Sequence, residues 1–232
     1  MPISKEYIQV GSELKPLRNT SLYPTSKIDD QKFEFIFMLD ISGSMYDEPI
    51  KLAKEALLLF LHSLPADCYF NVIAFQSGFR RIFPHSVKYS QETLNEAKDK
   101  VNSLKAGGLT DLYKPLCYVY SQPRINGYLT QIFTITDGQV DNRETVLELI
   151  KANVKHSRSF SLGIGDEVDR NLVIGIAENA GGTYEFVTCG ERIESKILNQ
   201  LKLALKPGLL QPIRVNTQSV LIPMYINVET NV

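Results

Sequence analysis

The sequence has almost no imbalance of charge, because its 25 basic and 26 acidic residues leave a formal net charge of -1. Such a balance gives no electrostatic reason to expect binding to nucleic acid or to an anionic membrane surface. No uninterrupted apolar run is long enough to cross a bilayer, and the first ten residues lack the apolar segment of a signal peptide. We therefore expect a cytoplasmic protein, or an extracellular one if the chain is a fragment of a secreted protein.

Cysteine is scarce as well, with only three residues: Cys68, Cys117 and Cys189. An odd number without close pairs argues against both a disulfide framework and a zinc knuckle, so we interpret them as reduced, mostly buried thiols. The remaining composition, 44% hydrophobic and 22% charged, is typical of a soluble globular protein. A chain of 232 residues fits one domain with a short appendage, and we expect a monomer.

The common catalytic motifs are also missing. The run ISGSM at 41–45 is not the G-x-S-x-G elbow, and neither a phosphate-binding loop nor a complete dinucleotide motif occurs. The three histidines have no evident route to the serines of that run: His62, His85 and His156. We expect no enzymatic activity. Phosphotransfer at Asp40 stays open as an alternative, although Ser42 stands where such enzymes normally carry a second acid.

Strand-like and helix-like segments alternate along most of the chain. Apolar runs predict strands at residues 33–39, 69–75, 80–83, 130–136, 159–164 and 183–187. Helical spacing predicts helices at residues 51–64, 90–104, 112–121, 143–154, 169–179 and 191–205. This alternation predicts a Rossmann-like α/β fold, with a doubly wound, mainly parallel six-stranded sheet and helices on both faces. The domain would span residues 33–208, after an irregular arm (1–32, with one strand near 7–10) and before a β-like tail (209–232).

Five oxygen-bearing residues are expected to meet at one edge of this sheet. Asp40, Ser42 and Ser44 follow the first strand, Thr110 lies in a glycine-rich loop, and Asp137 follows the strand at 130–136. Loops at the carboxyl ends of parallel strands form the ligand crevice of such sheets. Hydroxyl and carboxylate oxygens without His or Cys favour a hard divalent cation, so we expect Mg²⁺, with Mn²⁺ or Ca²⁺ as alternatives.

Each of these residues also has an ordinary structural interpretation. Serine and aspartate are favoured at helix starts, so Asp40, Ser42 and Ser44 could serve as caps. Thr110 and Asp111 could cap the short helix that follows them, and the aspartate before Gly138 could belong to a turn. Only the whole set, gathered at one edge of the sheet, points to a cation.

The motifs together resemble a known family. The D-x-S-x-S run at 40–44, the threonine after Gly-Gly and the aspartate of T-D-G resemble the metal-ion-dependent adhesion site of von Willebrand factor type A domains. The segments SGSM, AFQS, TDGQV, SLGIG and LALKPGL resemble the subgroup that follows a VIT (vault and inter-alpha-trypsin) domain, over residues 33–215. The resemblance implies that Ser42 and Ser44 bind the ion directly, joined by Thr110 in a ligand-bound state. It implies that Asp40 and Asp137 act mostly through water.

The resemblance also implies a function. A metal held by few direct carboxylates stays electron-poor and accepts a carboxylate from a protein partner, so we expect a non-catalytic binding module. The alternative is a structural scaffold in which the metal only braces loops. Partner contacts are expected at the rim: Tyr46, Asp47, Asp111 and Gln139. Asp47 and Glu48 add two carboxylates that either repel acidic ligands or help hold Ca²⁺, and the last helix, 191–205, is expected to shift on ligand binding.

Overall fold

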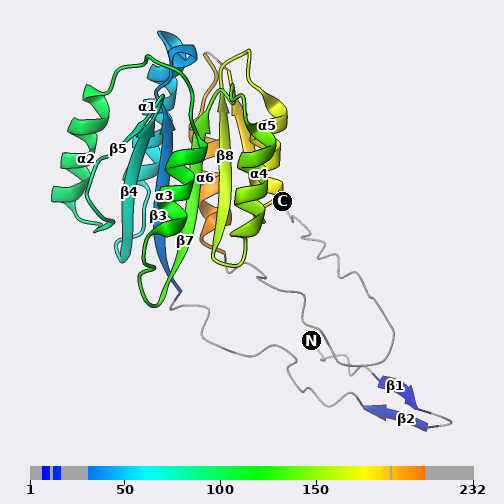
Figure 1. Ribbon diagram of the computed structural model, residues 1–232. Helices are drawn as coiled ribbons and strands as arrows, with labels where there is room; N and C mark the ends of the chain where they lie inside the picture. The colour runs from blue at the N-terminus through cyan, green and yellow to red at the C-terminus, as the bar shows by residue number, and fades with distance from the viewer. Residues whose placement is uncertain (1–6, 11–12, 17–30, 189, 207–232) are drawn as a thin grey trace.

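The computed structural model describes residues 7–10, 13–16, 31–188 and 190–206, and its main part is a twisted sheet between two helical layers (Figure 1). Five strands are parallel, in the spatial order β4-β3-β7-β8-β9. They are β3 (Lys32–Asp40), β4 (Cys68–Phe75), β7 (Tyr128–Thr136), β8 (Ser157–Ile164) and β9 (Tyr184–Val187). The predicted doubly wound α/β fold is therefore confirmed.

The described sheet has seven strands instead of the six predicted. The edge segment forms two short strands, β5 (Phe79–Arg81) and β6 (Val87–Lys88), which pair antiparallel with different parts of β4. A two-residue strand such as β6 carries no periodicity of its own, so the sequence could not predict it.

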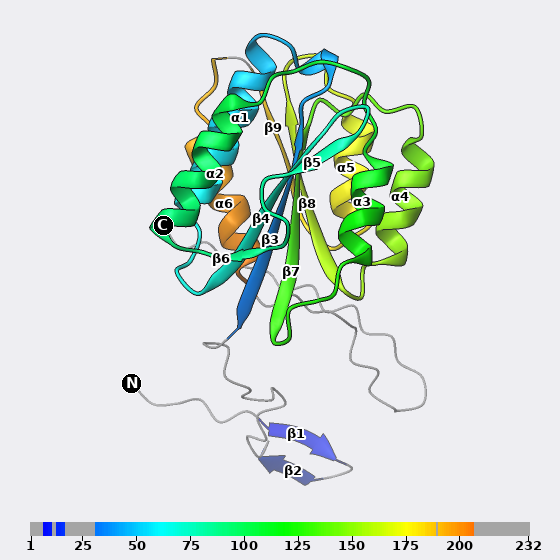
Figure 2. The same cartoon turned by 60° about the vertical axis from the view of Figure 1, so that its left-hand side comes forward.

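Three helices cover each face of the sheet (Figure 2). On one face lie α1 (Glu48–His62), α2 (Gln91–Ser103) and α6 (Glu194–Ala204). On the other face lie α3 (Tyr113–Ser121), α4 (Arg143–Ala152) and α5 (Arg170–Glu178). Helix α1 carries Pro49 in its first turn, where the missing N–H costs no helical hydrogen bond.

The core explains why the central strands are almost continuously apolar. On the α1 face, the ring of Phe133 lies 4.8 Å from those of both Phe60 and Phe160, measured between ring centroids. On the opposite face, Ile36 and Met38 are buried beneath α3 and α4. Because both faces of β3 are covered, alternation of polar and apolar residues is lost along it.

The ends of the chain are described only in part. The strand predicted near residues 7–10 is present as β1 (Tyr7–Val10), and it pairs antiparallel with β2 (Glu13–Pro16), which the sequence did not predict. The predicted tail, 209–232, lies outside the described residues, as does Cys189. Cys68 and Cys117 are free thiols. Among the described helices, none is long and apolar enough to span a membrane.

Candidate metal centre

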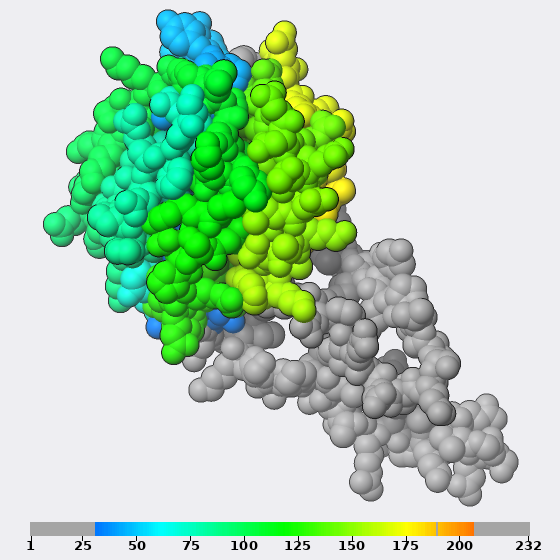
Figure 3. All heavy atoms as spheres, in the orientation of Figure 1, coloured from blue at the N-terminus to red at the C-terminus, as the bar shows by residue number. Residues whose placement is uncertain are grey.

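The carboxyl ends of β3 and β7 bring two aspartates to one end of the domain. Asp40 is the last residue of β3, and Asp137 directly follows β7. The two strands are hydrogen-bonded neighbours, with Leu39 opposite Ile135, so they end side by side. The chain then enters a short 3-10 turn, η2 (Gly43–Met45), before α1. The segment around this turn, light blue in Figure 3, protrudes at that end of the domain.

Asp40 is completely buried and held in one orientation. One carboxylate oxygen, Oδ1, accepts a hydrogen bond from the backbone N–H of Ser42 at 2.8 Å, and Oδ2 accepts one from the Thr136 hydroxyl at 2.6 Å. Burial raises the pKa of Asp40 to about 6 and the charge of Asp137 adds to the rise, while the hydrogen bonds from Thr136 and Ser42 oppose it. An ionised Asp40 is thus costly in this environment, and a nearby cation would relieve that cost.

The two serine hydroxyls lie at a separation that suits a small hard cation. Ser42 Oγ is 3.1 Å from Ser44 Oγ, and either hydroxyl can donate a hydrogen bond to the other. Adjacent ligands of an octahedral Mg²⁺, each about 2.1 Å from the ion, are about 3.0 Å apart. The hydroxyl pair therefore fits two neighbouring positions around such an ion as well as it fits a direct hydrogen bond.

Two backbone hydrogen bonds attach the Thr110 loop to the serine loop. The N–H of Gly43 donates to the Gly108 carbonyl, and the N–H of Gly107 donates to the Ile41 carbonyl, both at 2.9 Å. Gly108 has φ +80°, and a Cβ on Gly43 would lie only 3.0 Å from the Gly108 oxygen. The close approach of the two loops therefore depends on glycine at both positions. These two hydrogen bonds hold the loop that carries the half-buried Thr110 against the serine loop.

A third loop, after β4, supports the Thr110 loop from its other side. The Ser77 hydroxyl accepts a hydrogen bond from the N–H of Leu109 at 2.8 Å, and the Gln76 carbonyl accepts one from the N–H of Asp111 at 3.0 Å. Neither Ser77 nor Thr136 was predicted from the sequence to have a role at the site. Their only signal was the AFQS segment and the position of Thr136 directly before the aspartate.

Asp137 is held by the turn that follows it. Its side chain is 5% exposed, and Oδ1 accepts a hydrogen bond from the N–H of Gln139 at 3.2 Å. The carbonyl of Asp137 accepts another from the N–H of Asp169 at 2.8 Å. Gly138 has φ +81°, and a Cβ there would lie 2.8 Å from the Asp169 carbonyl oxygen. Only glycine fits, so the T-D-G motif has a steric cause.

The predicted rim residues differ in what their side chains do. Tyr46 is 75% exposed, and Leu109, which the sequence analysis did not single out, is 80% exposed. Asp47 has φ +70° and pairs, like Glu48, with Lys51, whose Nζ lies 3.3 Å and 2.6 Å from the two carboxylates. The two added carboxylates are thus partly neutralised by a lysine of the same helix.

The other two rim residues are engaged locally. The carboxylate of Asp111 accepts a hydrogen bond from the N–H of Lys114 and pairs with its Nζ at 2.7 Å, which lowers the pKa of Asp111 despite partial burial. Asp111 therefore accepts a backbone hydrogen bond from the first turn of α3, although the residue directly before this helix is Leu112. Gln139 is exposed, and its backbone donates to Asp137.

No described histidine forms a hydrogen bond with Ser42 or Ser44. His62 lies in the last turn of α1, while His85 and His156 line a cavity near the amino ends of the strands. Within the described part of the chain, no group of three His, Cys, Asp or Glu residues is placed to hold a metal ion. The candidate donor set therefore depends on hydroxyl oxygens.

This fold is that of a type A domain. The family model for the von Willebrand factor type A domain matches residues 33–186, and the chain belongs to that family. It is 43% identical over 184 residues to von Willebrand factor A domain-containing protein 5A of the mouse, an alignment that covers 75% of this chain and 23% of that protein. The chain spans about a quarter of the length of protein 5A from the mouse, the rat and the human.

Solved structures share the fold at low sequence identity. A manganese-loaded TRAP protein of Plasmodium vivax superposes with a TM-score of 0.60 at 16% identity, over 76% of this chain and 74% of that one. Proximal thread matrix protein 1 of the mussel byssus, with a zinc-occupied MIDAS motif, gives a TM-score of 0.60 at 16% identity, over 76% and 46% of the two chains.

Proposed function

We propose that this domain binds a divalent cation through Ser42, Ser44 and Thr110, with Asp40 and Asp137 acting through water. The cation is used for non-catalytic binding of a protein partner, whose acidic residue completes the metal shell. The observation that carries the proposal is the pair of hydroxyls 3.1 Å apart, directly after a buried carboxylate whose pKa is raised to about 6. Membership of the type A family supports a role as a protein-interaction module.

The charges of the donor set favour a partner carboxylate. Hydroxyl ligands donate no formal charge, and the two aspartates only balance a divalent ion. If both aspartates act through water, the ion keeps an attraction for another oxygen anion. A cage of three or four direct carboxylates would remove that attraction.

The separation of the two hydroxyls favours Mg²⁺ or Mn²⁺. Adjacent octahedral ligands of Ca²⁺, at about 2.4 Å from the ion, would be about 3.4 Å apart. The observed 3.1 Å between Ser42 Oγ and Ser44 Oγ is closer to the value for the smaller ions. We expect Mg²⁺ to be the resident ion.

The rim gives the partner a second property. Tyr46 and Leu109 belong to the two loops that Gly43 and Gly108 join, and both side chains are largely exposed. Large exposed apolar groups beside a polar centre are typical of protein-binding surfaces. We expect the partner's acidic residue to be flanked by apolar residues.

Calorimetric titration of the EDTA-treated protein with Mg²⁺, Mn²⁺ and Ca²⁺ tests the metal site. One-to-one binding should occur in the wild type and disappear in Asp40→Ala, while Asp99→Ala, an exposed substitution on α2, should leave it unchanged. Failure of the folded wild-type protein to bind any of the three ions would refute the site.

Partner binding separates the two candidate functions. Partners captured on the immobilised protein with Mg²⁺ should be released by EDTA and should not bind Ser44→Ala. Binding that survives both treatments would favour a scaffold in which the metal only braces loops. Turnover of a phosphate ester, lost in Asp40→Asn, would instead favour phosphotransfer.

We also propose that the chain belongs to the VIT-associated subgroup, which the segments SGSM, TDGQV and LALKPGL support.

A further inference from the structure

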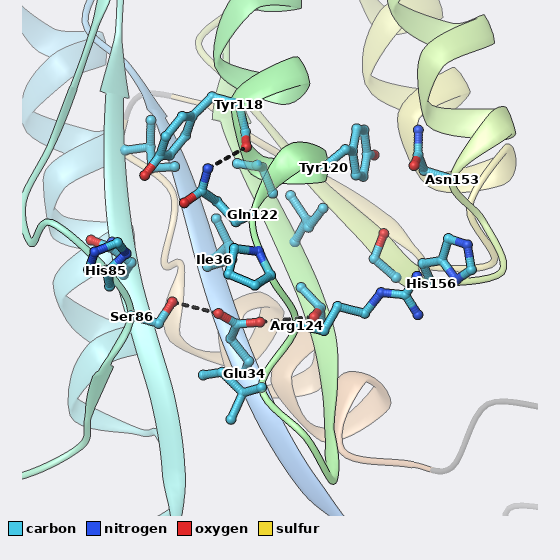
Figure 4. Close-up of a pocket in the computed structure, with 18 residues that line it drawn as sticks. Glu34, Ile36, His85, Ser86, Tyr118, Tyr120, Gln122, Arg124, Asn153 and His156 are labelled. Carbon is cyan, nitrogen blue, oxygen red and sulfur yellow. Dashed lines mark hydrogen bonds between the residues drawn. The ribbon is translucent and has the colours of Figure 1, made fainter.

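A second polar region lies at the other end of the sheet, in a cavity of about 340 Å³ (Figure 4). Its floor is the sheet face beneath α3, near the amino ends of β3, β7 and β8, and its walls come from the residues after α3 and after α4. Glu34 lies near the start of β3 and Asp40 at its end. Six residues of extended strand separate them by about 20 Å, so the cavity is distinct from the candidate metal centre.

Glu34 is the chemically distinctive group of this cavity. It is the single charged residue inside the β3 run FEFIFML, and it is only 9% exposed. Its two carboxylate oxygens accept hydrogen bonds from the Ser86 hydroxyl at 2.6 Å and from the Thr130 hydroxyl at 2.9 Å. Figure 4 shows both hydrogen bonds at the floor of the cavity.

No basic side chain neutralises Glu34 among the ion pairs of the described residues. A buried carboxylate is costly unless a cation accompanies it, and hydroxyl donors offset only part of that cost. Each of its oxygens has an acceptor position left after the hydrogen bonds from Ser86 and Thr130. The floor of the cavity therefore favours a ligand that brings a positive charge with N–H donors.

The walls add an apolar requirement. Ile36, Ile73 and Ile132 line the cavity from three adjacent strands, and Val119 lines it from α3. The volume lies at the lower end of the range of about 300–1,000 Å³ found for small-molecule sites. A small ligand therefore fits this space better than a drug-sized one.

Arg124 places one positive charge at the rim. It is exposed at the mouth of the cavity, as are the side chains of His85 and His156. If the ligand carried a second cationic group that reached the mouth of the cavity, Arg124 would repel that group. This arrangement favours a ligand with one positive charge over a polyamine.

We propose that this cavity binds a small organic monocation, namely a primary amine carried on a compact apolar group, with the ammonium ion paired to Glu34. The site is separate from the metal-dependent binding of a protein partner, and its occupancy does not require the metal. The apolar group lies between the isoleucines of the sheet and Val119.

Titration of the isotope-labelled protein with 2-phenylethylamine, followed by nuclear magnetic resonance, tests this assignment. In EDTA, the amine should shift the amide signals of Ser86, Thr130 and Asn153, and added Mg²⁺ should not change its affinity. The neutral isostere 2-phenylethanol should bind at least tenfold more weakly, and the diamine putrescine should also bind more weakly. Absence of amine binding at 10 mM, or equal affinity for amine and alcohol, would overturn the proposal.

Two variants identify the cause of binding. Glu34→Gln keeps the shape of the side chain but removes its charge, so it should reduce amine affinity at least tenfold and alcohol affinity less than twofold. Glu148→Gln, the same change at an exposed position of α4, should leave both affinities unchanged. Val119→Phe keeps the carboxylate but fills the cavity, so it should abolish binding of both ligands. Unchanged amine binding in folded Glu34→Gln or Val119→Phe would place the ligand elsewhere.

Discussion

Replacement of Asp40 by asparagine should make the metal-free domain more stable at neutral pH. Burial raises the pKa of Asp40 from 3.8 to about 6 in the folded protein. A rise of about 2 units corresponds to about 3 kcal/mol, since each unit is worth about 1.36 kcal/mol. The pKa of Asp40 is higher in the folded protein than in the unfolded one, so protonated Asp40 stabilises the fold relative to ionised Asp40. This contribution to stability is complete below pH 3.8 and is lost as the pH rises through 6.

The asparagine variant removes this titration at a small structural cost. Thr136 donates its hydroxyl proton to Oδ2 of Asp40 and accepts a hydrogen bond from the N–H of Gly138 at 2.9 Å. An amide NH₂ in place of Oδ2 would leave the Thr136 proton without this acceptor, at a cost of about 1 kcal/mol. The variant should therefore be less stable than the wild type by about 0.5 kcal/mol near pH 4 and more stable by roughly 2 kcal/mol at pH 8.

Urea unfolding in EDTA across this pH range measures the effect. Other carboxylates titrate in both proteins and cancel in the difference, so the difference in unfolding free energy should change by roughly 2–3 kcal/mol between pH 4 and pH 8. Asp99→Asn, an exposed change on α2, serves as the control and should give a flat difference. A flat difference for Asp40→Asn would mean that this carboxylate is not desolvated in the folded protein, and the electrostatic argument for the cation would fail.

Three other predictions concern the contact between the two loops, the aromatic core and the last helix. Gly43→Ala places a Cβ 3.0 Å from the Gly108 carbonyl oxygen, so Mg²⁺ affinity measured by calorimetry should fall about tenfold while the fold persists; unchanged affinity would mean that the loops adjust freely. Phe133→Ala removes the ring between Phe60 and Phe160 and should lower the unfolding free energy by about 3–5 kcal/mol in urea, and a loss below 1 kcal/mol would contradict the packing. Saturation with metal and a captured partner should change amide hydrogen exchange in α6, and unchanged exchange there would exclude movement of the last helix.

Much of the fold was predictable because its signals are local. The apolar runs of β3, β4, β7 and β8 and the helical spacing of α1 and α2 each lie within one segment of chain, and their positions agree with the structure. Errors occurred where local signals are short. Strand β6 has two residues and η2 has three, and neither length carries a detectable period.

The proposed donors of the candidate site have a local signal in the sequence, but the groups that support them do not. Asp40, Ser42 and Ser44 lie within five residues, so their pattern is visible in the sequence. The groups that orient them come from far along the chain: Thr136 is 96 residues from Asp40, and Ser77 is 32 residues from Leu109. Contacts of that kind follow from strand order and loop packing, which no single segment specifies.

The same strand nevertheless carried a signal for the second site. Glu34 and Asp40 are the only charged residues between Phe33 and Ile41. Each is buried, each accepts its hydrogen bonds from hydroxyl or backbone N–H groups, and neither belongs to an ion pair among the described residues. An acid retained in an otherwise apolar central strand, without a basic partner, lowers stability wherever it is ionised. The two proposed ligands, a metal ion at Asp40 and an ammonium ion at Glu34, would each supply a positive charge that no ion pair of the described residues supplies there.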